Sequence, residues 1–163
     1  AQQQPALLQH GVDLGEQPGR QIVFLQPVAK AQDRALVGKR VIASVQTDPF
    51  WAVRKSSLEA LARLKTKTGP AVFKKACHDP DSQIRAAALV ALGDLKDRTL
   101  FDFYKGLFQK DVSYRVQVEA LSAIGKAGDP SAVPFLKQAA AVPSYRDMLR
   151  RAAEAALKQF ENK

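Results

Sequence analysis

The densest group of side chains that could carry chemistry is the run Cys77-His78-Asp79-Pro80-Asp81. A zinc site uses about four ligands, usually in separated pairs, and the sequence holds no second pair. A cysteine and a histidine that are neighbours on a helix also point apart, so they do not form a nucleophile with its base. The sequence therefore predicts no metal, no cofactor and no catalytic thiol.

Other catalytic signatures are also missing from the sequence. The segment Gly15–Arg20 has two glycines but lacks the G-x-x-x-x-G-K-[ST] pattern of a phosphate loop. The only histidines, His10 and His78, stand in no motif that would support a Ser-His-Asp triad. We therefore expect that the chain is not an enzyme.

Aromatic residues recur at one place in a repeating pattern. Trp51, Tyr114 and Tyr145 share that place, and Ser82 interrupts the series. The rings could form a platform on which a peptide or a flipped base stacks. They could instead cover the gaps between adjacent structural repeats, and this packing interpretation is favoured because rings at repeat junctions are mostly core.

Arginine recurs in the same pattern, as Arg54, Arg85 and Arg150, each one residue after an apolar position. The guanidinium groups could form a track for phosphate or carboxylate ligands. They could instead bridge adjacent repeats by bidentate pairing with the turn residues Asp79 and Asp111. The bridging interpretation is favoured because the aspartates recur in register with the arginines.

The elements that position these side chains are four similar segments. Each begins with turn residues and continues with apolar side chains at helical spacing, which marks the buried face of an amphipathic helix. The first apolar anchor recurs at intervals of 31, 32 and 33 residues, as Val53, Ile84, Val116 and Leu149. The segments are Asp48–Leu64, Asp79–Leu95, Asp111–Ala127 and Val142–Phe160.

A second helical run precedes each of these segments. These runs cover Ala35–Gln46, Pro70–His78, Thr99–Lys110 and Ser131–Ala141. One helical pair cannot bury its apolar face alone, but stacked pairs can. We therefore predict an all-α fold, an α-α superhelix (solenoid) of four helical pairs.

Finer expectations follow from this repeat pattern. Gly93 and Gly125 stand where left-handed helix ends are expected. Leu89 and Leu121 are expected to be fully buried between repeats.

Residues 1–34 differ from the repeats and are predicted to form an irregular N-terminal arm, with residues 35–163 as the repeat domain. The arm is rich in Gln, Gly and Pro and contains one apolar run, Gln21–Leu25. We expect Val23, Phe24 and Leu25 to cover the apolar edge of the first repeat, since the end of a solenoid is otherwise exposed.

The repeats at 79–93 and 127–136 resemble the HEAT-like repeats of phycobilisome lyases. The phrases DPFWAVR at 48–54 and DVSYRVQVEAL at 111–121 are similar to the HEAT-like C-terminal region of bacterial M1-family zinc aminopeptidases. The H-E-x-x-H and G-x-M-E-N signatures of that family's catalytic body are missing from this sequence. The resemblance therefore implies an accessory module, one that docks on a catalytic body.

The 163 residues carry a formal net charge of +9, which suggests an anionic partner. The basic excess is spread along the chain, whereas nucleic-acid surfaces usually concentrate Lys and Arg on one stripe. The longest uncharged stretch in the helical part, Gln138–Tyr145, is far shorter than the ~20 apolar residues of a membrane span. We expect no membrane partner and no specific nucleic-acid binding, and the sequence does not indicate a compartment.

The favoured function is a non-catalytic scaffold that binds another protein or another domain of its own chain. A nucleic-acid binder that uses a basic concave face remains the alternative. A solenoid lines its concave face with the second helices of its pairs. The residues expected on that face are Trp51, Lys55, Glu59, Arg63, Arg85, Tyr114, Glu119 and Arg151.

Overall fold

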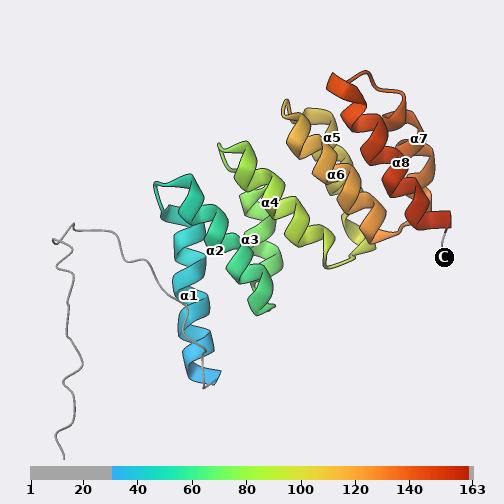
Figure 1. Cartoon of the computed structure of the whole chain (residues 1–163). Coiled ribbons are helices and arrows are strands. Elements are labelled where there is room, and N and C mark those ends of the chain that lie inside the picture. The colour runs from blue at the N-terminus through green and yellow to red at the C-terminus, as the bar shows by residue number, and fades with distance from the viewer. Residues whose placement is uncertain (1–30, 162–163) are drawn as a thin grey trace, which may run out of the picture.

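The computed structural model describes residues 31–161, with side chains from residue 36 onward. Within that range it contains eight α-helices and no strand, which confirms the all-α class and the stacked helical pairs (Figure 1). The α-helices are α1 (Ala31–Thr47), α2 (Trp51–Leu64), α3 (Gly69–Ala76), α4 (Ser82–Gly93), α5 (Phe101–Lys110), α6 (Tyr114–Ala127), α7 (Val133–Ala140) and α8 (Met148–Glu161). Short 3-10 turns precede α5, α7 and α8: η1 (Arg98–Leu100), η2 (Pro130–Ala132) and η3 (Tyr145–Asp147).

The helices form two layers. The second helices of the pairs, α2, α4, α6 and α8, contact one another in series, and each also packs on the first helix of its own pair (Figure 1). The apolar core lies between the layers and continues from one pair to the next. This arrangement places one long face of α2, α4, α6 and α8 away from the core.

The predicted core register is confirmed at the residues that test it. Leu89 and Leu121 have no exposed surface. The anchors Ile84, Val116 and Leu149 are 0%, 0% and 1% exposed. The prediction is wrong for Val53, which is 39% exposed, because its side of α2 faces the position of a preceding pair and the described residues contain none.

The prediction that Gly93 and Gly125 form left-handed helix ends is wrong. Both lie inside helices, and a Cβ atom on Gly125 would stand 2.8 Å from Cβ of Ala156. A Cβ atom on Gly93 would stand 3.0 Å from Cα of Ala123. The two glycines therefore let successive second helices approach closely, and the left-handed end of α6 is supplied by Gly128, at φ 70°.

Two predicted boundaries are also corrected. Helix α1 begins at Ala31, four residues before the expected start, so the helical region reaches into the segment that was assigned to the arm. The expected helix 142–160 is interrupted, because Arg146 and Asp147 adopt positive φ and divide it into η3 and α8. The interval from Val116 to Leu149 is 33 residues, one more than the preceding interval of 32, and the break lies within this longer interval.

An aspartate holds the turn before each of α2, α4 and α6, although of these three helices only α4 has a side-chain cap, in which Asp81 accepts from Gln83 N–H at 2.7 Å. The side chains of Asp48, Asp79 and Asp111 each accept a bond from the backbone N–H two residues later, at 2.9, 2.8 and 2.9 Å. Ser144 Oγ accepts from Leu149 N–H at 3.0 Å. The arm residues Val23, Phe24 and Leu25 lie outside the described residues.

Candidate partner-binding surface

The face of the second helices that points away from the core is the candidate surface, and we call it the outer face. Its residues follow helical spacing along each helix, so they share one side. The outer face consists of Ser56, Glu59 and Arg63 of α2, Val90 of α4 with Asp94 directly after it, Arg115, Glu119, Ser122 and Lys126 of α6, and Ala155 and Gln159 of α8.

Two of its acidic residues are already engaged. Lys55 Nζ lies 2.8 Å from Glu59 Oε1, one helical turn away, and both side chains are part exposed. Lys126 Nζ lies 2.7 Å from Asp94 Oδ1 and so joins α6 to the end of α4. Sequence analysis missed this second pair, although Asp94 and Lys126 hold equivalent places 32 residues apart.

The remaining charged groups of the outer face are Arg63, Arg115 and Glu119. Arg63 is exposed, and its Nε donates to the backbone oxygen of Glu59 at 3.4 Å. Glu119 is half-buried, and this burial raises the pKa of its carboxyl, although the charges of Lys126 and Arg115 act in the opposite direction. Val90, 38% exposed, adds an apolar group to the outer face on α4.

The aromatic residues of the series differ in exposure from one repeat to the next. Trp51 is half-buried, and its ring packs on that of Phe50 with centroids 6.1 Å apart. The prediction that these rings lie mostly in the core is wrong for Tyr114 and Tyr145, which are 43% and 62% exposed. The junctions are filled instead by the apolar anchors and by the glycine contacts, so the rings at the helix starts remain at the rim.

The arginine bridges are confirmed at two junctions. Arg54 binds both carboxylate oxygens of Asp79, with Nε and Nη2 at 3.0 and 2.9 Å. Arg85 binds those of Asp111 in the same way, at 2.7 and 2.9 Å. Each Nη1 also donates to backbone oxygens of its own turn.

These bridges remove Arg85 from the predicted partner surface, because its guanidinium is held between two repeats. The Arg85 bridge also changes the pKa of Asp111. Burial alone would raise the pKa of this carboxyl, but the hydrogen bonds from Arg85 and from Ser113 N–H, with the charge of Arg85, hold it below its usual value. The arrangement is a structural ion pair, as expected from the register of the aspartates.

The series of arginine bridges does not continue to the junction between the third and fourth helical pairs. Gln117 replaces arginine there, and its Nε2 donates to the backbone oxygen of Asp111 at 2.8 Å, while its buried Oε1 has no partner among the described residues. The turn before α8 carries no aspartate at the corresponding position. Arg150 binds Asp147 of its own turn at 2.6 Å, so the prediction of a bridge does not extend to it.

Arg151 also lies elsewhere than predicted. It occupies the register place of Ala86, which is buried against the next repeat. Arg151 stands in the last helix, so it is exposed at the end of the stack, where its Nη2 donates to the backbone oxygen of Arg146 at 3.0 Å.

In the structure, the side chains of Cys77, His78 and Asp79 have separate environments and do not form one site. Cys77 is buried, and burial raises the pKa of its thiol to about 12. His78 Nδ1 lies 3.2 Å from the backbone oxygen of Lys74, and Asp79 is engaged by Arg54. Among the described residues, no three His, Cys, Asp or Glu side chains are grouped so that they could hold a metal ion.

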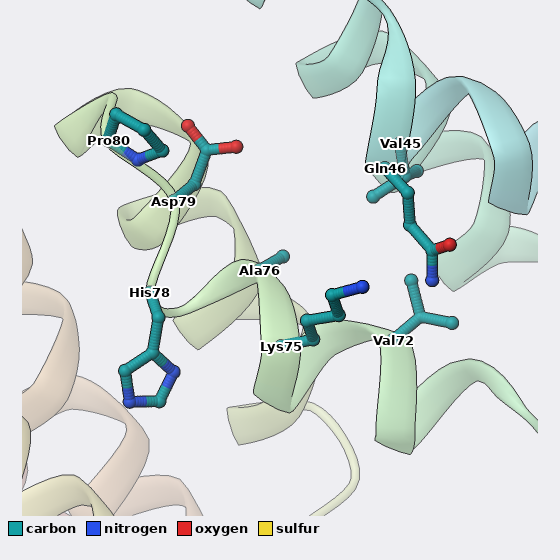
Figure 2. Close-up of a pocket in the computed structure, with 8 residues that line it drawn as sticks. All are labelled: Val45, Gln46, Val72, Lys75, Ala76, His78, Asp79 and Pro80. Atoms are coloured by element: carbon teal, nitrogen blue, oxygen red, sulfur yellow. The ribbon is translucent and has the colours of Figure 1, made fainter.

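A shallow groove lies near this run, between the ends of α1 and α3. Its volume is about 270 Å³. Figure 2 shows Gln46, Val72 and Lys75 directed into the gap between the helices, whereas the His78 ring points away from it. The wall is mainly apolar, with Val45 and Ala76 buried beneath it. It contains no arrangement of an acid, a base and a nucleophile.

Comparison with known proteins now assigns the family. A family model described as HEAT repeats matches residues 39–112 and 70–158, which together cover most of the chain. The chain belongs to the HEAT-repeat family. HEAT repeats commonly act as protein-interaction scaffolds and are typically non-catalytic. No curated protein matches this HEAT-repeat chain.

The same family assignment fits the observed stack of helical pairs, each with its second helix in one layer. Over the stretch from Ala31 to Glu161, no helix is both long and apolar enough to cross a bilayer.

Proposed function

We propose that this HEAT-repeat protein is a non-catalytic scaffold that binds a protein segment along the outer face. One observation carries the proposal. The Arg54–Asp79, Arg85–Asp111 and Lys126–Asp94 pairs join repeats, whereas Arg63, Arg115 and Val90 on the outer face are exposed and take part in no pair between repeats. Surfaces of this kind on solenoids form extended binding sites.

The composition of the outer face suggests the chemistry of the partner. Arg63 and Arg115 are exposed and form no ion pair among the described residues, although the charge of Arg115 acts on Glu119, and Val90 lies on the helix between them. Tyr114 stands at the rim, 43% exposed. Arginine and tyrosine are enriched at binding hot spots. A segment that carries both apolar and acidic side chains would match this face.

One partner of this kind is the catalytic body of an M1-like aminopeptidase. The support is the resemblance of DPFWAVR and DVSYRVQVEAL to the C-terminal region of that family. In this version of the proposal, the solenoid docks on the catalytic body and contributes no catalytic group.

The test compares two double variants with the same change of charge. Arg63→Glu with Arg115→Glu alters the outer face, and Lys74→Glu with Lys137→Glu alters exposed sites on α3 and α7. A photo-reactive residue at Val90, with Ala71 as the control position, identifies the partner by cross-linking. We expect the partner to cross-link at Val90 and to be lost only from the outer-face variant. Equal loss from both variants would contradict this site.

Nucleic acid is the alternative partner, favoured by the net charge of +9. Binding that depends on scattered charges weakens steeply with salt. We expect a fluorescent duplex to bind weakly and to dissociate as the salt concentration rises. Submicromolar binding at physiological salt, reduced by the outer-face variant, would replace the protein-scaffold proposal with the alternative. An aminoacyl-anilide assay and zinc analysis of the purified chain test the expected lack of catalysis.

A further inference from the structure

The N-terminal edge of the stack repeats the chemistry of an internal junction but lacks the covering partner. Asp48 holds the same turn position as Asp79 and Asp111. Those two carboxylates each receive a bidentate arginine from the preceding repeat. Among the described residues, the Asp48 carboxylate accepts only the N–H of Phe50, at 2.9 Å.

A second observation marks the same edge. Val53 is 39% exposed, while Ile84, Val116 and Leu149 at the equivalent position are covered by the preceding pair. Phe50, beside Asp48, is 57% exposed. The edge therefore combines an acceptor suited to a guanidinium with an adjoining apolar surface. We call these three residues, Asp48, Phe50 and Val53, the N-terminal seat.

We propose that the N-terminal seat binds Arg20 and the apolar residues that follow it in this chain. Arg20 would donate to Asp48 as Arg54 donates to Asp79, and Ile22–Leu25 would cover Phe50 and Val53. The match is one of chemistry: Arg20 is separated by one residue, Gln21, from the apolar run Ile22–Leu25, and in the observed bridge Arg85 stands beside the apolar Ile84.

The length of the chain before α1 permits this contact. Helix α1 has 17 residues and separates Ala31 from the seat by about 25 Å, at 1.5 Å per residue. The stretch from Arg20 to Ala31 can extend to about 36 Å, at 3.3 Å per residue. A segment tethered at this distance has an effective concentration of the order of millimolar, so weak contacts suffice.

A double-mutant cycle tests the ion pair. Asp48→Asn keeps the oxygen that accepts from Phe50 N–H but removes the charge, and Arg20→Gln removes the guanidinium. We expect each replacement to increase the unfolding equilibrium constant about three- to tenfold in urea titrations, and the double variant to add little more. Arg63→Gln, at an exposed guanidinium away from the seat, is the matched control and should show no coupling to Asp48→Asn.

A paramagnetic label tests the contact directly in the full chain. Ile22→Cys carries the spin label, since the buried Cys77 thiol is protected from the reagent. We expect broadening of the Val53 and Phe50 signals, and none from a label at Gln3→Cys. Additive single effects without broadening would overturn the proposal.

The occupant can also come from another molecule. Mixing isotope-labelled chains that lack the spin label with spin-labelled chains that lack the isotope detects that case. Broadening in this mixture, and not within single molecules, would assign the seat to a second copy and would overturn intramolecular docking. These measurements use the isolated protein and involve no partner. A negative result would therefore overturn docking at the N-terminal seat without contradicting the proposed binding surface on the outer face.

Discussion

The junction between the first and second helical pairs is held differently from the junction between the third and fourth. At the first, Arg54 bridges to Asp79, and α2 presents Ala62 where later helices present glycine. At the third, Gln117 replaces the arginine, and Gly125 brings α6 against Ala156 of α8. Helix α2 also packs less extensively on α4 than α6 does on α8.

The middle junction uses both devices, since Arg85 bridges to Asp111 and Gly93 lies against Ala123. A bidentate ion pair fixes the relative rotation of two repeats, because both nitrogens must meet both oxygens. A glycine contact fixes their separation. From the first junction to the third, the bidentate ion pair is therefore replaced by close packing between helix backbones.

The largest expected effect compares buried leucines in the first and third helical pairs. Leu58 of α2 and Leu121 of α6 both have no exposed surface. Replacing either by Ala should cost about 2–5 kcal/mol of unfolding free energy. Leu121→Ala should cost more, because α6 is held between two close neighbours and cannot relax into the cavity. Urea titration followed by circular dichroism measures both, and a larger loss at Leu58 would break the comparison.

The ion-pair bridge should carry the next largest effect. Arg85→Ala leaves the Asp111 carboxylate, 7% exposed, without its bidentate partner. We expect a loss of about 1–3 kcal/mol, and only partial recovery with Arg85→Lys, which lacks the paired donors. Arg150→Ala removes an exposed pair in a single turn and should change stability by less than about 0.5 kcal/mol. If Arg85→Ala and Arg150→Ala lower the melting temperature equally, the Arg85–Asp111 pair does not stabilise the junction between the second and third helical pairs.

The same bridge predicts a pH dependence. The folded-state pKa of Asp111 lies below its unfolded value, so the stabilisation is present above the unfolded pKa, near 4. It is lost as the pH falls from there through the folded pKa. Asp111→Asn should therefore flatten the acid limb of the stability curve relative to wild type. An unchanged limb would show that other carboxylates control it.

Close packing at the third junction is tested by a smaller change. Gly125→Ala places a Cβ atom within 2.8 Å of Ala156 and should cost about 1–3 kcal/mol, partly offset by the higher helix propensity of Ala. Gly106→Ala, where no atom lies within 4 Å, should stabilise by about 0.5–1 kcal/mol. Melting temperatures of the two variants should therefore move in opposite directions. Stabilisation by Gly125→Ala would mean that the helices can separate freely.

The smallest effect is expected away from both junctions. Tyr104 of α5 is fully buried, and its hydroxyl has no partner among the described residues. Tyr104→Phe should be neutral or stabilising by up to about 1 kcal/mol, because the unpaired hydroxyl is costly to bury. Calorimetry measures this baseline. A clear loss of stability would reveal a hydrogen-bond partner for the hydroxyl.

The repeat pattern predicted the helices, the buried leucines and two ion-pair bridges because each depends on local periodicity or on a recurring partner. It did not predict the exposure of Val53, since an identical position is core or edge depending on whether a neighbour precedes it. The role of Gly125 was also missed. A glycine near a helix end suggests a cap, and only the approach of α8 shows that the missing side chain is needed for packing.

The candidate surface was predicted less well than the fold. Arg63 and Glu119 lie on the outer face, but Arg85 is engaged between repeats and Arg151 lies at the end of the stack. A repeating position looks the same in sequence whether it points outward or toward the next repeat. Only the completed stack distinguishes these directions.

The buried thiol of Cys77 can report local opening of the structure through its rate of chemical modification. It is the one cysteine of the chain, it is 1% exposed, and its pKa near 12 leaves almost no thiolate at neutral pH. A thiol reagent can therefore modify it only during transient openings of the second helical pair. When closing is faster than modification, the labelling rate reports the equilibrium population of the open form. The rate at which a reagent modifies this thiol in native buffer thus measures the population of the open form of the second helical pair, without any engineered probe.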